Sequence, residues 1–167
     1  MKKRSAQKIF KALNEDGVQF LVAGGLAVNV HGSLRFTADI DIVVRLLPEN
    51  IHKTFAAFRR IGYRPIVPVT AASFADEPTR KGWIRDKGMR VLQFYSEEHL
   101  ETPVDIFVEE PFSFDEEYGR ALVKPLADGT PVPFVSLSTL LQMKKSAGRP
   151  QDLADIDDLQ RGTEEHG

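Results

Sequence analysis

The chain has 167 residues, of which 42% are hydrophobic and 28% are charged. This length is usual for one domain, and the hydrophobic fraction is sufficient for a packed core, which argues against a disordered protein. A formal net charge of -2 argues against a generally basic nucleic-acid binder, and the absence of cysteine excludes disulfides and thiolate metal sites. No apolar signal region follows the basic N-terminus, and the longest apolar stretch is too short and interrupted to span a bilayer. We therefore expect a cytoplasmic protein without a membrane partner.

The first part of the chain predicts helices that alternate with strands. Apolar residues three and four apart predict a first amphipathic helix, with Ser5 as its N-cap and Gly17 just past its end. Further on, Pro48 is placed to open a helix and Gly62 to end it. The expected elements are helix 6–13, strand 20–23, helix 26–31, strand 39–44 and helix 48–61.

The second part of the chain predicts mainly strands, followed by two helices. Residues 63–79 are expected to form one short strand followed by a loop. Residues 83–85 and 89–95 resemble a hairpin around Asp86-Lys87-Gly88, with Gly88 in the left-handed conformation. Strands are expected at 103–108 and 131–135, and helices at 137–147 and from Pro150 to about 161, with Leu153, Ile156 and Leu159 as the buried stripe of the last helix. The sequence thus predicts one α/β (α+β) domain over residues 1–161, with its core at about 5–135, C-terminal helices at about 136–161 and a flexible tail at 162–167.

Two carboxylates begin the second expected strand, in the run Thr37-Ala38-Asp39-Ile40-Asp41-Ile42. Asp39 and Asp41 are two residues apart, so on a strand they project from the same face. Carboxylates held that close raise each other's pKa unless a cation lies between them, and Mg²⁺ prefers such oxygen ligands. A solvated strand edge is the structural alternative. The apolar residues that follow favour the metal-binding interpretation, because acidic residues are depleted in strands that enter a core.

Gly24 and Gly25 lie between an apolar strand and a helix, an arrangement in which backbone N–H groups can receive phosphate. A tight turn is the simpler explanation of such a pair. Thirteen residues separate Gly25 from Asp39, enough for the chain to return, so the glycine turn and the acidic strand can end side by side. Asp105 lies on a third apolar strand, where a carboxylate is costly unless it is paired with an Arg or bound to metal.

Charged residues outside the strands complete the candidate set. Lys144 occupies the apolar stripe of its helix, where it either snorkels or meets a negative partner, and we favour a nucleotide triphosphate. Arg35 and Thr37 stand just ahead of the acidic pair and can contact phosphate, although Arg35 can equally neutralise Asp39 or Asp41. Asp152 and Asp155 fall in the first turn of the last helix, where the helix dipole alone favours them.

Taken together, these motifs resemble the DNA polymerase β-type nucleotidyltransferase superfamily, and more narrowly the small bacterial group related to the AbiEii abortive-infection toxins. The resemblance covers residues from about 20 to 160. Its motifs are Phe20-Leu-Val-Ala-Gly24-Gly25-Leu-Ala, Arg35-Phe-Thr37-Ala-Asp39-Ile-Asp41-Ile-Val, Val104-Asp105-Ile-Phe and Leu140-Leu-Gln-Met-Lys144-Lys-Ser-Ala-Gly-Arg149-Pro-Gln-Asp152-Leu-Ala-Asp155-Ile.

The resemblance implies a mixed β-sheet flanked by helices and a metal-dependent nucleotidyltransferase that moves a nucleoside monophosphate from an NTP to a hydroxyl. It implies that Asp39, Asp41 and Asp105 bind two Mg²⁺ (or Mn²⁺) ions. It further implies that Gly24 and Gly25 hold the triphosphate, and that Lys144 and Asp152 form the Lys-then-Asp motif of the toxin group. The acceptor stays open: tRNA or another RNA, a protein or a small molecule. An antitoxin partner is a further expectation.

Three other interpretations compete with this one. The first is a catalytically degenerate domain of the same fold that binds nucleotide or a protein partner. The second is a phosphohydrolase and the third a glycosyltransferase, because both classes also use Asp-x-Asp. The phosphohydrolase motif follows an apolar strand, whereas here the apolar run follows Asp41, and neither class explains the glycine pair. A basic cluster can guide an RNA acceptor, with a solvated hairpin face as its alternative; it comprises Arg80, Lys81, Arg85, Lys87 and Arg90.

Overall fold

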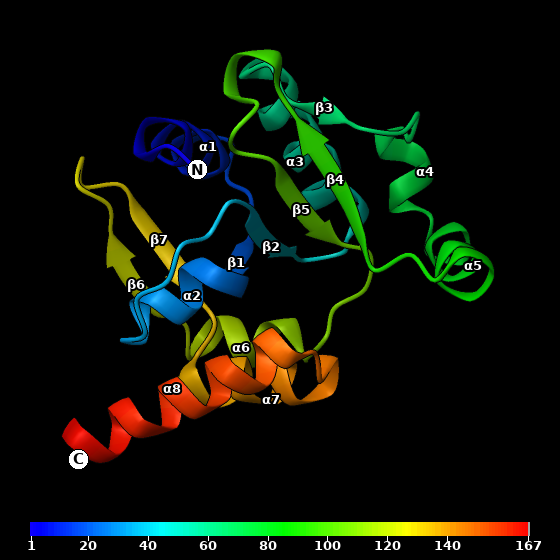
Figure 1. Ribbon diagram of the computed structural model, residues 1–167. Helices are drawn as coiled ribbons and strands as arrows, with labels where there is room; N and C mark the ends of the chain where they lie inside the picture. The colour runs from blue at the N-terminus through cyan, green and yellow to red at the C-terminus, as the bar shows by residue number, and fades with distance from the viewer. Residues whose placement is uncertain (167) are drawn as a thin grey trace.

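The computed structural model describes residues 1–166, and Gly167, the last residue of the expected tail, lies outside them. Within residues 1–166, seven strands form one mixed sheet in the order β3-β4-β5-β2-β1-β7-β6 (Figure 1). This confirms the expected α/β class. The strands are β1 (Phe20–Ala23), β2 (Ile40–Val44), β3 (Arg64–Pro65), β4 (Val91–Tyr95), β5 (Val104–Phe107), β6 (Leu122–Pro125) and β7 (Pro131–Phe134).

The three central strands are the most apolar, and they fix the register at the site. All four residues of β1 are buried, as are four of the five residues of β2. Strand β1 runs antiparallel to β2 and pairs Ala23 with Asp41, whereas β5 runs parallel to β2 and pairs Asp105 with Asp41. The last residue of β1 and the first residues of β2 and β5 therefore lie together at one end of the sheet.

Helices surround this sheet. Helix α1 packs against α3, helix α2 packs against β1 and β2, and α7 packs against α8. Figure 1 shows α6, α7 and α8 gathered beyond one end of the central strands, with α4 and α5 on the side of β4. Among residues 1–166, no helix is long and apolar enough to cross a membrane. The helices are α1 (Lys3–Glu15), α2 (Gly24–Val30), α3 (Pro48–Arg60), α4 (Ala71–Ala75), α5 (Glu77–Lys87), α6 (Phe114–Gly119), α7 (Leu137–Ala147) and α8 (Pro150–His166), with a short 3-10 turn, η1, at Glu97–His99.

The expected hairpin at 83–95 is wrong, because its first arm belongs to helix α5. Asp76 caps this helix by accepting a hydrogen bond from the Thr79 N–H, and Pro78 stands in its first turn. Gly88 does adopt the left-handed conformation (φ 60°), but it ends a helix rather than turning a hairpin. The expected loop before it is also partly wrong, since Thr70 and Ser73 form a capping box that begins α4.

Four further details differ from the sequence expectations. Ser5 lies inside α1, and its hydroxyl hydrogen-bonds the His99 ring instead of capping the helix. Helix α6 and strand β6 were not expected. Helix α8 continues through His166, although an end near residue 161 and a tail from 162 were expected. On α8, Leu153 is 58% exposed, whereas Asp152 and Asp155 are buried beside Ile156 and Leu159.

Candidate active site

The glycine turn touches the acidic strand directly. Gly24 has a φ of 61°, in the left-handed region that favours glycine, and it begins α2 immediately after β1. A Cβ atom added at Gly24 would lie 1.9 Å from Oδ2 and 2.9 Å from Cβ of Asp41. Only a residue without a side chain fits there while Asp41 keeps its position. The expected meeting of the turn and the strand is therefore confirmed.

The sheet side of the site concentrates negative charge. The pKa of Asp41 is raised to about 6 by burial first, then by the charges of Asp105 and Asp39, against the opposing influence of Lys144 and Arg149. The pKa of Asp105 is also raised, chiefly by burial and further by Asp39, although Gln93 donates a hydrogen bond to its Oδ1 at 3.0 Å. The three carboxylates thus affect one another, with Asp39 just ahead of β2.

These carboxylates have the oxygen chemistry that a hard divalent cation requires. They do not form a closed cage: among residues 1–166, no three His, Cys, Asp or Glu side chains are placed to hold a metal ion by themselves. Mg²⁺ is commonly bound by one or two carboxylates together with substrate phosphates, so the paired Asp41 and Asp105 suit it without a third ligand in place. The residues present fit a cation that is shared with a phosphate-bearing substrate.

Arg35 and Thr37 support the second glycine of the turn. A Cβ atom at Gly25 would lie 2.5 Å from the Thr37 Oγ1 and 3.2 Å from the Arg35 Nη2. The Arg35 Nη1 donates a hydrogen bond to Asp155 at 2.8 Å, so Arg35 neutralises neither Asp39 nor Asp41. The Arg35 Nε is buried, and no residue among 1–166 forms a hydrogen bond with it. Arg35 thus connects the glycine turn to α8.

The helical side of the site is an ion-pair network of four residues besides Arg35. The Lys144 Nζ lies 3.2 Å from Asp152 and 3.0 Å from Asp155, and only 8% of the Lys144 side chain is exposed. The Arg149 Nε donates to Asp152 at 2.7 Å. Burial alone would raise the pKa of Asp152, but the hydrogen bonds from Arg149 and Lys144 hold it below its ordinary value. Lys144 therefore does meet a negative partner, and in this structure the partner is a pair of aspartates on α8.

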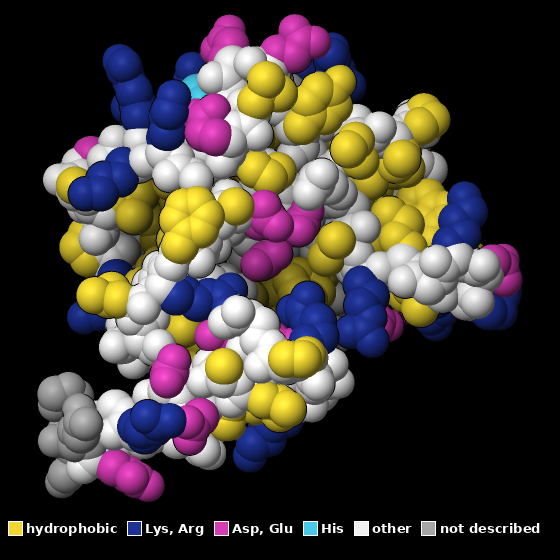
Figure 2. Space-filling model, in the orientation of Figure 1, with side chains coloured by type: hydrophobic (Ala, Val, Ile, Leu, Met, Phe, Trp, Pro, Cys, Tyr) yellow, Lys and Arg dark blue, Asp and Glu magenta, His cyan; other side chains and the backbone are white. Residues whose placement is uncertain are grey.

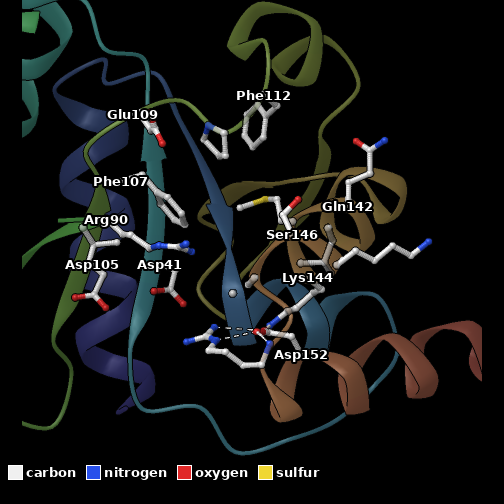
Figure 3. Close-up of a pocket in the computed structure, with 18 of the residues that line it drawn as sticks. Asp41, Arg90, Asp105, Phe107, Glu109, Phe112, Gln142, Lys144, Ser146 and Asp152 are labelled. Atoms are coloured by element: carbon white, nitrogen blue, oxygen red, sulfur yellow. Dashed lines mark hydrogen bonds and ion pairs between the residues drawn. The ribbon is translucent and has the colours of Figure 1, made fainter. Parts of the chain in front are cut away.

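An open cleft of about 1250 Å³ separates these two sides. Gly24, Asp41 and Asp105 line one wall, and Lys144, Arg149 and Asp152 line the other. Figure 2 shows acidic side chains gathered in a hollow at the centre of this face, with basic side chains along its lower border. In Figure 3, Asp41 and Asp105 project from neighbouring strands into the cleft, and Lys144 is directed toward Asp152. Within the described part of the chain, the residues that line the cleft do not include Asp39, Gly25, Arg35 or Thr37.

Some residues at the site gave weaker sequence signals. Gln93 is a polar residue in the otherwise apolar strand β4, directly opposite Asp105. Arg149 stands one residue before Pro150, in the position where its N–H and guanidinium both reach Asp152. The expected basic cluster is dispersed: Arg80 is buried and donates to the Phe74 carbonyl, Arg90 lines the cleft, and the remaining members are exposed on α5.

The chain has the same fold as several solved structures that are described as nucleotidyltransferases or nucleotidyltransferase-like. The lincosamide antibiotic adenylyltransferase LnuA, solved with lincomycin bound, is 16% identical with a TM-score of 0.63, over 96% of this chain and 97% of that one. ANT(2")-Ia, solved in complex with adenylyl-2"-tobramycin, is 14% identical with a TM-score of 0.59, over 96% and 88%. An antigenic nucleotidyltransferase-like protein from Paracoccidioides brasiliensis is 14% identical with a TM-score of 0.55, over 94% and 74%. At these identities the likeness is one of fold. No curated protein matches the sequence.

The arrangement of strands and helices gives the chain the fold of these nucleotidyltransferases. Residues 9–166 match the model of one family, described as the nucleotidyl transferase AbiEii toxin of type IV toxin–antitoxin systems. The chain belongs to this family. The resemblance inferred from the sequence motifs is thereby confirmed, and nucleotidyl transfer is the type of function that the family carries.

Proposed function

We propose that the chain transfers a nucleoside monophosphate from an NTP to a hydroxyl acceptor in a reaction that depends on Mg²⁺ or Mn²⁺. The observation that carries the proposal is the in-register pair Asp41 and Asp105, which faces a wide cleft directly beside the Gly24 turn. Among residues 1–166, neither Asp41 nor Asp105 forms an ion pair with a Lys or Arg side chain, and paired carboxylates with raised pKa values favour a divalent ion and its phosphate ligands.

In this reaction the acceptor oxygen bonds to the α-phosphorus, and the bond from that phosphorus to the oxygen bridging the α and β phosphates breaks. Pyrophosphate leaves with the electron pair. When bound, divalent cations neutralise phosphate charge and lower the pKa of the attacking hydroxyl. Asp105, whose raised pKa makes its carboxylate a better base, would accept the hydroxyl proton.

The remaining site residues would hold the substrate. The backbone N–H groups of the turn at Gly24 and Gly25 would receive phosphate, while the missing side chains leave room for Asp41 and Thr37 beside the turn. Lys144 and Arg149 already reduce the pKa of Asp41 through their charge, so their field extends across the cleft to the place where phosphates would lie. Arg35 and Thr37 would keep the glycine turn in place, and Asp152 would keep Lys144 and Arg149 in place. Asp39 adds a third carboxylate for the cation.

Incubation with each of the four α-labelled NTPs, Mg²⁺ and a panel of RNA, protein and small-molecule acceptors tests the proposal. We expect the wild type and the exposed-surface control Asp86→Asn to label an acceptor, and the double variant Asp39→Ala, Asp41→Ala to label none. If the wild type labels nothing but calorimetry detects Mg²⁺-dependent NTP binding, the degenerate-domain interpretation replaces this one.

We also propose that the protein acts as the toxin of a toxin–antitoxin pair in the cytoplasm, with tRNA or another RNA among the acceptors to be tested. The family model supports the pairing, since its members are described as type IV toxins. Expression of the chain in a bacterium should arrest growth, and Asp41→Asn should relieve the arrest. Unchanged growth with the wild-type chain at high expression would count against a toxin role.

A further inference from the structure

The sheet wall of the cleft changes from polar to apolar over one pleat. Asp105 and Phe107 project from the same face of β5, because side chains two residues apart on a strand share a face. The register places Gln93 beside Asp105 and Val91 beside Phe107. One row across the sheet is therefore polar, and the next row, about 6.6 Å further along the strand, is apolar.

Further apolar side chains line the cleft together with this row. Met89, Met143 and Phe112 line the same cleft as Phe107, and all four are partly buried side chains that pack against the hydrophobic core. In Figure 3, Phe112 lies at the opposite end of the cleft from Lys144 and Asp152, with Phe107 between that end and Asp105. Phe107, Val91, Met89, Met143 and Phe112 are called the ring pocket below.

The cleft is larger than the triphosphate end requires. Pockets for small ligands are typically about 300–1000 Å³, and this cleft measures about 1250 Å³. Phenylalanine faces and methionine sulfurs both interact favourably with flat rings. We propose that the ring pocket binds a planar aromatic ring carried by one of the two reactants and holds it directly beside the reacting phosphate. This inference rests on the proposed function only for the position of that phosphate.

Two sources of such a ring exist: the nucleobase of the NTP, or a ring on the acceptor. Calorimetric titration of ATP and of inorganic tripolyphosphate, both with Mg²⁺, separates them. If the ring is the nucleobase, the wild type binds ATP more tightly than tripolyphosphate. Phe107→Leu then weakens ATP binding by about tenfold and leaves tripolyphosphate binding unchanged. The matched control is Phe55→Leu, which changes an equally half-buried phenylalanine on α3 outside the cleft.

An aromatic probe tests the second possibility, that the ring belongs to the acceptor. Anilinonaphthalene sulfonate should bind the wild type and Phe55→Leu with similar affinity and bind Phe107→Leu more weakly. Displacement of the probe by ATP but not by tripolyphosphate indicates the nucleobase, whereas probe binding alongside ATP indicates the acceptor. Met89→Ser, in the loop between α5 and β4, provides a second variant should Phe107→Leu fail to fold.

The proposal is overturned if Phe107→Leu and Met89→Ser both fold and both bind ATP and the probe as the wild type does. A failure of the proposed function looks different. In that case no acceptor is labelled and neither ATP nor tripolyphosphate binds, while the loss of probe binding in Phe107→Leu still reports on the ring pocket.

Discussion

The two walls of the cleft hold aspartates in opposite electrostatic states. On the sheet side, the pKa values of Asp41 and Asp105 are raised chiefly by burial and further by neighbouring carboxylates, which are Asp105 and Asp39 for Asp41, and Asp39 for Asp105. On the helical side, Asp152 has a lowered pKa because Lys144 and Arg149 hydrogen-bond to it. The same residue type is therefore held in ion pairs on one wall and repelled by neighbouring carboxylates on the other. Burial alone does not distinguish the two roles, whereas the charge of the neighbours does.

The largest expected effect is a loss of transfer activity when an aspartate of the sheet wall is substituted. Asp41→Asn and Asp105→Asn should each lower the rate of nucleotidyl transfer by at least about 10³-fold, since a cation site contributes several kcal/mol of transition-state stabilisation. Single-turnover assays with labelled NTP measure this loss. An Asp41→Asn variant that retains most of the wild-type rate would remove Asp41 from the proposed mechanism.

Substitution on the helical wall should instead act on stability. Asp155→Ala leaves Arg35 and Lys144 with one partner fewer in a buried setting, and we expect it to lower the free energy of unfolding by about 3 kcal/mol. Asp41→Asn should raise that free energy, because it removes a repelled carboxylate. Urea denaturation of both variants without divalent cations makes the measurement. If both substitutions shift stability in the same direction, the contrast between the two walls is wrong.

The sequence predicted the sheet side better than the helical side. The buried run of β1, the glycine pair and the acidic start of β2 are local features of the sequence. Thirteen residues separate Gly25 from Asp39, so the connection between the glycine pair and the acidic strand is short. The ion pair between Arg35 and Asp155 joins residues 120 positions apart, and no local pattern encodes it. Leu153 was expected in the core for the same reason: an apolar stripe is the usual guide to the buried face of a helix, and here neutralised aspartates occupy that face.

The misassigned hairpin has a physical cause as well. A glycine with positive φ ends helices and turns hairpins alike, so Gly88 did not decide between them. The deciding signals were the Asp76 cap and Pro78, at the start of a helix that runs for 11 residues before Gly88. The fold class, by contrast, follows from the strands that the sequence does specify.

The contact between the glycine turn and Asp41 can be tested with two matched substitutions. Gly24→Ala and Gly17→Ala both place a side chain at positive φ, with an expected cost of about 1 kcal/mol each. Gly24→Ala also displaces Asp41, whereas no atom of the described residues lies within 4 Å of a Cβ atom added at Gly17. We expect about 100-fold loss of transfer activity in Gly24→Ala and wild-type activity in Gly17→Ala. Equal activity in the two variants would argue that Asp41 need not hold its position.

The smallest expected effect is a pH dependence of stability. The pKa of Asp41 is about 6 in the folded protein, above its ordinary value of 3.8, so the folded state binds the proton more tightly than the unfolded state does. Stability should therefore decrease as pH rises from about 4 to about 6, by on the order of 2 kcal/mol from this group. Comparing wild-type and Asp41→Asn melting curves over this range isolates the contribution. If the difference in stability between the wild type and Asp41→Asn stays constant with pH, Asp41 does not make this contribution.

Calorimetric titration of Mn²⁺, with a non-hydrolysable ATP analogue present, tests directly whether the sheet wall binds the cation. The titration compares the wild type, Asp41→Asn and Asp152→Asn at pH 7.5. We expect cation binding in the wild type, its loss in Asp41→Asn and its retention in folded Asp152→Asn. Equal binding by the wild type and Asp41→Asn, or loss of binding only in Asp152→Asn, would contradict the assignment of the cation to the sheet wall.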